Sequence, residues 1–397
     1  MLFRLEIENF YSVAERQAID FSLRVPEDPR FALVYPNSKK RAPKLVAVFG
    51  PNASGKTVFL RAIAFLALFA RDSFQFPPNQ PLPTFSFKNE HWAKNPTRLA
   101  VEIGGRPLFP ETEGATYPPG VYRYELEIQS QKGSFPSSVT KESLFYQPST
   151  RRKPFLVFER GSDGTVKGSN LFPIIQTTPT IKVRPNTSVI STYAQLGHQI
   201  ALEFQKALQG FQSNLWEADL TPPSLIFLFR QHPDLLKDAN RELRRLDLRL
   251  LELTVSDNGE LIFKHQGLNE PIPWGFESNG TQSFIRSFPR LWIALNTGGI
   301  AVLDELDASI HPEVLREIIS WFWDPQKNRH NAQLFFSCHN VLLLNELQKE
   351  EILLCEKTPK EGYTRMYRLA DIKGIRKSED FVRGYWHGAY GALPNIG

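Results

Sequence analysis

The sequence predicts an α/β protein with a mixed parallel core sheet, a β-rich lobe and an inserted helical subdomain. Three observations lead to this prediction: an apolar strand that runs into a glycine-containing loop and a buried helix, a proline-rich middle that turns helical, and a compact alternation of helices and strands near the C-terminus. With 397 residues, the chain is long enough for two domains or for one large domain with an insertion.

Composition excludes several classes of protein. Hydrophobic residues make up 41% of the chain and charged residues 22%, which argues against a disordered, collagen-like or coiled-coil chain. The longest nearly apolar run, Val58–Ala70, is shorter than the roughly 18 residues of a membrane helix and contains Arg61. Because Arg4 and Glu6 interrupt the apolar N-terminus, no signal peptide is expected. We therefore predict a cytoplasmic protein without a membrane segment.

The cysteines and the net charge are less informative. Cys338 and Cys355 are too few for a disulfide framework and lack metal-ligand spacing, so reduced thiols are expected. The formal net charge of +5 permits contact with nucleic acid, but over 397 residues it is a weak signal.

The first third of the chain has the pattern of strands around one buried helix. Leu2–Phe10 alternates apolar and charged residues, as in a half-buried strand, and Lys44–Phe49 is a second, apolar strand. Val58–Ala70 is apolar on all sides and has neither Gly nor Pro, which indicates a buried helix. Prolines then separate the short strands Arg98–Ile103 and Val121–Ile128, so residues 71–129 are interpreted as a β-rich lobe.

Between about residues 196 and 253 the apolar period becomes helical. Leucine or alanine recurs at steps of three and four, as in a short packed seam, at Leu236, Ala239, Leu243, Leu246, Leu250 and Leu253. The same helix carries a basic stripe at steps of four, made of Lys237, Arg241, Arg245 and Arg249. Two interpretations of the stripe stay open: a solvated face beside the seam, or a surface for nucleic acid or an acidic partner.

After Gly275 a compact order of helix, strand, helix and strand returns and runs to about Leu354. We therefore expect one domain assembled from both ends of the chain, residues 1–129 and 254–397. Residues 130–253 would be inserted into it as a mixed, partly helical subdomain.

The strongest chemical motif lies between the second strand and the buried helix. Gly50-Pro51-Asn52-Ala53-Ser54-Gly55-Lys56-Thr57 matches the pattern G-x-x-x-x-G-K-[ST] of a phosphate-binding loop. Small residues let backbone N–H groups surround phosphates at a helix N-terminus, where the helix dipole favours anions. Lys56 would then reach the β- and γ-phosphates of ATP, and the Thr57 hydroxyl would ligate Mg²⁺.

A second motif supplies the acidic partner that such a loop needs. Residues 299–303 are an apolar run, typical of a buried parallel strand, and are followed by Asp304 and Glu305. Asp304 would hold Mg²⁺ through water, while Glu305 could polarise the attacking water as general base. The alternative is that both carboxylates are merely the acidic first turn of the following helix.

Two further segments point to a subclass of nucleotide-binding protein. Glu277-Ser278-Asn279-Gly280-Thr281-Gln282, the signature segment, precedes a helix that runs to about Asn296. Ser278 suits an N-cap there, and Gly280 allows an anion close to the backbone. Further on, His339 ends another apolar strand, where its imidazole could touch a γ-phosphate.

In this order the motifs resemble the ABC-type ATPase heads of the SMC, RecF and OLD families. The resemblance covers the chain from Met1 through the first helix and again from Trp274 to Gly397. The signature segment resembles the E-S-x-G-T form of stand-alone bacterial AAA family ATPases. Leu306-Asp307-Ala308-Ser309 resembles the D-loop, and Gly384–Pro394 is similar to a G-x-Y-G-A-x-P tail of these proteins. No Q-loop glutamine can be assigned from the sequence, because neither Gln75 nor Gln80 has a diagnostic context.

The resemblance implies a head-to-tail homodimer, or a higher even oligomer, that encloses two ATP molecules with Mg²⁺. The signature segment of each chain would face the nucleotide of the other, and loss of the γ-phosphate would let the dimer open. The residues implied at the nucleotide, besides residues 50–57, are Ser278, Asn279, Gly280 and Thr281 from the other chain, Asp307 of the D-loop, Thr57 and Asp304 at the metal, and Glu305 and His339 as catalytic groups.

The resemblance also suggests what the ATPase controls. OLD proteins carry a Toprim nuclease after the ATPase, but the 58 residues 340–397 are too few for one and lack an Asp-x-Asp pair. Stand-alone ATPases of this kind resemble components of bacterial anti-phage systems, in which the ATPase senses infection and controls a separate nuclease or toxin. The alternatives are a RecF-like DNA repair or recombination ATPase, which the basic stripe would serve, a nucleotide-dependent scaffold, and a transporter subunit, which the signature disfavours.

Overall fold

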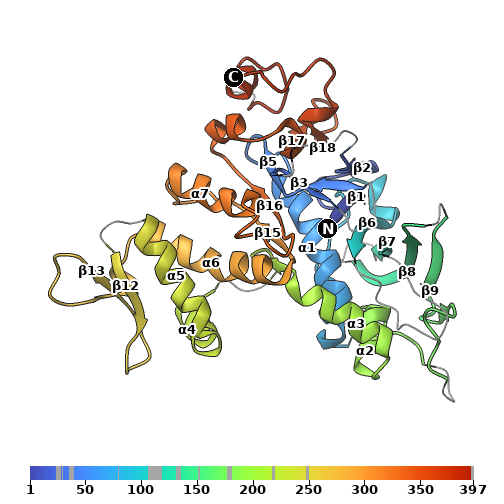
Figure 1. Cartoon of the computed structure of the whole chain (residues 1–397). Helices are drawn as coiled ribbons and strands as arrows, with labels where there is room; N and C mark the ends of the chain where they lie inside the picture. The colour runs from blue at the N-terminus through green and yellow to red at the C-terminus, as the bar shows by residue number, and fades with distance from the viewer. Residues whose placement is uncertain are drawn as a thin grey trace.

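The computed structural model describes residues 1–23, 28, 30–34, 40–78, 80–105, 119–130, 136–150, 153–176, 181–216, 220–246 and 250–394. A central sheet lies between a large antiparallel sheet on one side and a projecting module of helices and a small sheet on the other (Figure 1). None of the helices in these residues combines the length and the hydropathy that a membrane crossing requires.

The central sheet has six strands and confirms the predicted α/β fold with a mixed core sheet. Its order is β11-β15-β16-β5-β17-β18, in which only the β17–β18 pair is antiparallel. β5, β15 and β16 are buried, mostly apolar runs because both faces of the sheet are covered there. The bounds of the six strands are β5 Leu45–Phe49, β11 Gln212–Ser213, β15 Ile300–Leu303, β16 Gln333–Ser337, β17 Ile352–Lys357 and β18 Thr364–Arg368.

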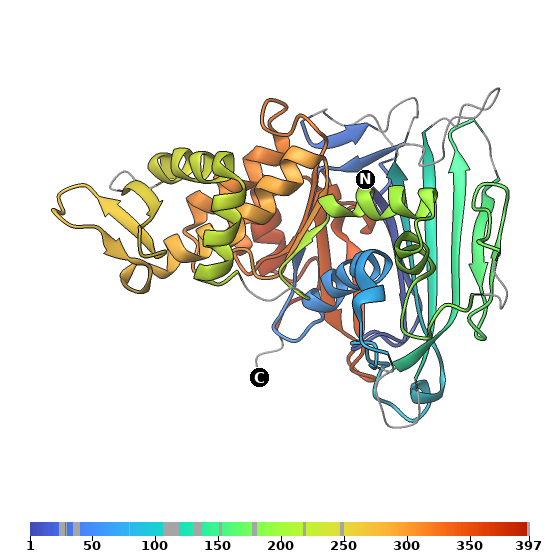
Figure 2. The same ribbon diagram turned by 90° about the horizontal axis from the view of Figure 1, so that it is seen from below.

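Seven antiparallel strands form a second sheet at one side of the molecule (Figure 2), in the order β10-β9-β8-β7-β6-β1-β2. The boundary expected between residues 129 and 130 falls inside the β7–β8 hairpin of this sheet. The β-rich part therefore reaches residue 168 and includes the N-terminal strands, because strand pairing and not proline content sets its extent. Its strands are β1 Leu2–Glu8, β2 Gln17–Asp20, β6 Thr97–Gly105, β7 Gly120–Ser130, β8 Pro136–Pro148, β9 Phe155–Arg160 and β10 Val166–Gly168, and a separate ribbon pairs β3 Ala32–Val34 with β4 Arg41–Pro43.

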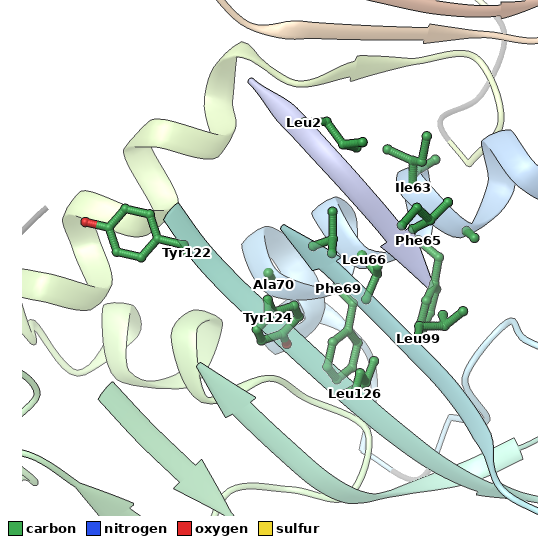
Figure 3. Close-up of a cluster of buried hydrophobic side chains, with 14 of the residues drawn as sticks. Leu2, Ile63, Phe65, Leu66, Phe69, Ala70, Leu99, Tyr122, Tyr124 and Leu126 are labelled. Atoms are coloured by element: carbon green, nitrogen blue, oxygen red, sulfur yellow. The ribbon is translucent and has the colours of Figure 1, made fainter. Parts of the chain in front are cut away.

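Alternate residues of the central strands belong to two hydrophobic cores. Val46 and Val48 join the core shared by α1 and the seven-stranded sheet, whereas Phe49 joins the core shared by α6 and α7. Figure 3 shows the first core, where Phe65 and Phe69 of α1 lie against side chains of the sheet. The helices around the two sheets are α1 Lys56–Asp72, α2 Val189–Gln195, α3 Gln199–Ala207, α6 Asn279–Thr297, α7 Pro312–Trp323 and α8 Phe381–Trp386.

A distal module projects from the central sheet on the side opposite the seven-stranded sheet (Figures 1 and 2). It consists of α4 Pro222–Gln231, α5 Pro233–Leu246 and a three-stranded sheet of β12 Leu250–Val255, β13 Leu261–His265 and β14 Ile272–Pro273. In the sequence, this module lies between β11 and the signature segment at the start of α6.

The prediction of one helical seam through Leu253 is wrong, since Leu250 and Leu253 lie on β12. A register shift between Leu250 and Glu252 adds one residue to the strand, so two leucines three positions apart are both buried. A bulged strand and a helix therefore produce the same spacing of buried leucines.

Glu6 on β1 lies among arginines of the seven-stranded sheet. Its side chain is 8% exposed, and Arg16 and Arg123 donate to it at 2.6 and 3.0 Å, with Arg4 2.8 Å away. Burial acts to raise the pKa of Glu6, but the hydrogen bonds and charges of Arg123 and Arg16 outweigh it and lower the pKa to about 2.

A carboxyl whose pKa is lowered by folding stabilises the fold above its unfolded-state pKa, and this stability is lost as pH falls through the folded-state pKa. We therefore expect the thermal midpoint of unfolding to depend more steeply on pH between 4.5 and about 2 in the unmodified protein than in Glu6→Gln. Circular dichroism melts across this window measure the difference. Parallel curves for the two proteins would contradict the prediction.

Candidate nucleotide site

Three predicted site segments meet at the carboxyl edge of the central sheet, because the strands that precede them run parallel. The phosphate-binding loop, residues 50–55, follows β5, Asp304 and Glu305 follow β15, and His339 comes two residues after β16. Since β16 lies between β5 and β15, the three segments are neighbours. This edge is the usual position of ligand sites in open α/β sheets.

Two glycines shape the phosphate-binding loop. Gly50 has φ 147° and Gly55 has φ 111°, a region that other residues rarely adopt. A Cβ atom on Gly50 would lie 2.1 Å from the carbonyl oxygen of Cys355, and one on Gly55 would lie 2.4 Å from Thr364 Oγ1. Both positions therefore require glycine. α1 begins at Lys56, so the unpaired N–H groups of its first turn lie at this loop.

Lys56 folds back over the loop that precedes it. Its ammonium donates to the carbonyl oxygens of Gly50 at 2.9 Å and Pro51 at 3.1 Å, and the residue is buried. Burial lowers the pKa of Lys56, while acidic groups nearby, Asp304 and Glu305 among them, act in the opposite direction. The loop is therefore a place where a cation and helix N–H groups converge, which suits a bound anion.

The N-terminal turn and β18 support the loop from outside. Thr364 Oγ1 donates to the carbonyl oxygen of Ser54 at 2.7 Å, and it lies 2.7 Å from Ser12 Oγ. The backbone N–H of Thr364 also donates to the Ser12 carbonyl oxygen at 2.7 Å. The loop is thus held by two segments that are distant in the sequence, 42 residues before and 310 residues after Ser54.

Asp304 and Glu305 are fixed by Ser337 at the end of β16. The Ser337 hydroxyl donates to Asp304 Oδ1 at 2.5 Å and accepts the backbone N–H of Glu305 at 2.7 Å. Glu305 has φ 51°, a left-handed conformation that is uncommon for a non-glycine residue and recurs at functional sites. Its side chain is 63% exposed.

His339 and Asp307 complete this edge of the sheet. His339 Nε2 lies 3.9 Å from Glu305 Oε1, and the histidine side chain is 43% exposed. Asp307 Oδ2 accepts the backbone N–H groups of His339 at 2.8 Å and Asn340 at 2.9 Å, so the D-loop holds the histidine segment in place. Glu305 and His339 therefore face the same open space.

The signature segment lies at the start of α6, as expected. Ser278 is the N-cap, and its hydroxyl accepts the Thr281 backbone N–H at 3.1 Å. A Cβ atom on Gly280 would lie 2.9 Å from the Ser309 carbonyl oxygen, so the segment packs on the D-loop of its own chain. Among the hydrogen bonds of the described residues, none joins Ser278, Asn279, Gly280 or Thr281 to residues 50–57.

The sequence matches the family described as "AAA domain, putative AbiEii toxin, Type IV TA system" over residues 45–345. The chain belongs to this AAA-domain family. The match spans the phosphate-binding loop, the signature segment, Asp304 and His339, so this AAA-domain protein has the P-loop ATPase domain of its family.

One solved structure shows a fold like that of this AAA-domain protein. The SMC head bound to the C-winged helix domain of ScpA has a TM-score of 0.51 at 12% identity, covering 92% of this chain and 97% of that one. The SMC head domain from Thermotoga maritima has a TM-score of 0.41 at 13% identity, covering 92% and 98%. None of the curated proteins compared with the sequence matches it. The domain is therefore a P-loop ATPase domain of the ABC/SMC-like type in fold.

Asn214 is a site residue of the AAA-domain protein that sequence reasoning missed. It follows β11, which pairs with β15, and its side-chain amide exchanges two hydrogen bonds with the Asp304 backbone, at 2.8 and 3.0 Å. Gln75, one of the two glutamines considered for the Q-loop, lies beyond the C-terminus of the 17-residue α1. About 25 Å of helix therefore separates it from the phosphate-binding loop. The sequence signal for Asn214 was weak because β11 has only two residues.

The basic stripe is only partly free of acidic partners. Lys237, Arg241 and Arg245 lie exposed on α5, and Arg249 lies outside the described residues. Arg241 pairs with Asp238 at 2.6 Å, and Arg245 pairs with Glu242 and Glu317. These pairs favour the packed, solvated interpretation for part of the stripe, away from the nucleotide edge.

Proposed function

We propose that this protein binds ATP with Mg²⁺ at the residue 50–57 loop and hydrolyses it as a head-to-tail dimer, and that this cycle controls a separate effector in a bacterial anti-phage system. One observation carries the proposal: Lys56, Asp304, Glu305 and His339 converge at one edge of the sheet, with Glu305 and His339 exposed and 3.9 Å apart.

Binding of the triphosphate would rest on the loop and the start of α1. Lys56 would exchange its hydrogen bonds to the Gly50 and Pro51 carbonyl oxygens for phosphate oxygens, which are stronger partners for an ammonium because they are charged. The helix N–H groups would add neutral donors at the same place.

The donor set at this edge suits Mg²⁺. Within the described residues no three His, Cys, Asp or Glu side chains form a metal cage. Mg²⁺ usually takes one or two protein oxygens together with phosphate oxygens and water, and the Thr57 hydroxyl and Asp304 carboxylate are hard oxygen donors of that kind. Bound there, Mg²⁺ would neutralise phosphate charge during transfer.

Glu305 is the best placed general base. Ser337 fixes its backbone, and the carboxylate extends into open space where a water molecule can reach it. His339 beside it would donate a hydrogen bond to the γ-phosphate and so detect whether that phosphate is present. Asp307 would act through His339 as a positioning residue, since it holds the histidine backbone.

The exposed signature segment supports completion of the site by a second copy. Ser278 and Asn279 are exposed, and Phe276, two residues before Ser278, is 83% exposed. An aromatic side chain so open next to a capped helix N-terminus suits a surface that is covered in an assembly. In the dimer, Ser278 and Gly280 would approach the γ-phosphate bound by the other chain, so its loss would weaken the closed state.

Mixing two inactive variants tests this arrangement. Lys56→Ala should lose nucleotide binding. Ser278→Arg should lose ATP turnover but keep nucleotide binding. In a head-to-tail dimer, each mixed pair has one complete site, so an equimolar mixture should recover about a quarter of the unmodified turnover. Steady-state phosphate release measures the recovery.

The matched control replaces Ser278→Arg by the double variant Lys56→Ala/Ser278→Arg. Mixed pairs with Lys56→Ala then contain no complete site, and no recovery is expected. Recovery in neither mixture, with a nucleotide-bound monomer in light scattering, would show that each chain works alone.

The effector part of the proposal draws on the family description, which names a toxin and a Type IV toxin–antitoxin system. The native host should lose its protection against phage when Lys56→Ala replaces the chromosomal copy. Phage plating measures this loss. If plating is unchanged and DNA instead stimulates ATP turnover in a salt-sensitive manner, a repair or recombination role replaces the defence role.

A further inference from the structure

A basic groove lies between α5 and the edge strand β12 of the distal module, and no step of the nucleotide cycle uses it. Its volume is about 840 Å³. Four cations line it, namely Lys237, Arg241, Arg244 and Arg245, against one carboxylate, Glu252, and its apolar residues include Leu236.

The cations of the groove differ in how much of their charge is free. Arg241 and Arg245 are paired, and their shared partner Glu242 is buried beneath them. Within the part of the chain that the structure describes, Lys237 and Arg244 have no acidic partner. The solvent-facing charge of the groove is therefore positive.

The walls of the groove are already joined through the backbone of β12. The Asn240 side chain donates to the Leu253 carbonyl oxygen at 2.8 Å and accepts its N–H at 2.7 Å, so it takes the place of a neighbouring strand. Arg244 Nε donates to the Leu251 carbonyl oxygen at 2.8 Å. Because these groups are paired, a ligand cannot add as a further strand there. Side chains must recognise it.

The combination of apolar and cationic side chains decides the class of ligand. Nucleic acid backbones offer phosphates but leave apolar surface such as Leu236 and Pro233 uncovered. A peptide that alternates acidic and apolar side chains satisfies both the cations and the apolar surface. We propose that the groove binds an acidic, apolar segment of a partner protein.

The same groove is connected to the signature segment. β12 pairs with β13, whose last residue His265 places Nε2 2.7 Å from Glu277 Oε2, and Glu277 Oε1 accepts the Ser278 backbone N–H at 2.7 Å. On the other wall, Asp238 of α5 accepts from Trp292 of α6 at 2.9 Å. A ligand in the groove would thus bias the position of Ser278. This second part rests on the proposed ATP-dependent dimer.

Binding is tested by selecting random 12-residue peptides on the full-length protein. Enriched peptides should combine Asp or Glu with Leu or Phe, and Lys237→Glu/Arg244→Glu should weaken them about tenfold or more. The control Lys167→Glu/Lys360→Glu makes the same charge change at exposed lysines elsewhere and should bind normally. The single variant Lys237→Glu, which removes no hydrogen bond to β12, guards against a folding defect.

Three results would overturn the proposed peptide groove: no enrichment, equal affinity of the selected peptides for both double variants, or a single-stranded oligonucleotide that binds the groove when no peptide does. Coupling is tested with the selected peptide and light scattering. The peptide should shift the ATP concentration needed for dimerisation in the unmodified protein but not in His265→Ala, which should still bind it. If the peptide does not change the ATP concentration that the unmodified protein needs for dimerisation, the coupling alone is overturned. If ATP drives no dimerisation at all, the proposed function is overturned, and peptide binding is then judged by the peptide selection alone.

Discussion

Glu305→Gln should lower steady-state ATP turnover by about 10²- to 10⁴-fold, the usual contribution of a general base, and leave ATP binding intact. The amide has nearly the shape of the carboxylate but cannot take a proton from water. Its backbone N–H would still donate to Ser337, so Asp304 and the loop should keep their positions. With hydrolysis blocked, the closed dimer should accumulate, which size-exclusion chromatography with light scattering in the presence of ATP and Mg²⁺ would detect.

Glu313→Gln is the matched control for this prediction. Glu313 is an exposed carboxylate at the start of α7 and contacts Arg316, so its replacement should leave turnover unchanged. Equal turnover of Glu305→Gln and the unmodified protein would remove Glu305 from the base role. Lost nucleotide binding would instead assign it a structural part in the site.

The core of the fold could be predicted because its local signals and its packing agree. The loop at residues 50–57 follows an apolar strand and opens a buried helix, which β5 and α1 reproduce. The apolar run before Asp304 and the run before His339 became β15 and β16 for the same reason: strands buried on both faces have few polar residues. Parallel pairing then places their ends together, so the predicted site segments become neighbours.

The remaining parts depend on contacts between distant residues that leave little local trace. Nothing near Asn214 in the sequence marks it as a partner of Asp304, which is 90 residues away. The support of the loop by Thr364 requires knowing that β18 lies beside it. In the distal module, the bulge in β12 reproduced a helical spacing of leucines, and a one-residue register shift is not encoded in apolar periodicity.

A fully buried ion pair joins β8 and β9 of the seven-stranded sheet, and the removal of one partner should be costly. Glu142 of β8 is fully buried and accepts from Tyr124 Oη at 2.8 Å, from Arg160 at 3.4 Å and from the Val189 backbone N–H at the start of α2. Arg160 in turn donates to the Thr187 carbonyl oxygen at 2.6 Å. Burial raises the pKa of the Glu142 carboxyl, and the Arg160 charge acts against that rise.

Glu142→Ala should therefore destabilise the protein by about 3–5 kcal/mol, because it leaves a buried guanidinium without its countercharge. Denaturant unfolding followed by circular dichroism measures the loss. Glu159→Ala is the control, since the pair that Glu159 on the neighbouring strand makes with Lys141 at 3.6 Å is exposed, and its loss should cost about 1 kcal/mol or less. The double variant Glu142→Leu/Arg160→Met should be more stable than Glu142→Ala, because it removes both charges. A loss below about 1 kcal/mol in Glu142→Ala would show that Arg160 is satisfied by carbonyl oxygens alone.

The same variant also tests a link to the nucleotide site. Ser191 of α2 accepts the N–H of Phe74 just beyond α1. An accompanying loss of ATP affinity would therefore show that the Glu142–Arg160 pair also supports the phosphate-binding loop at the other end of α1.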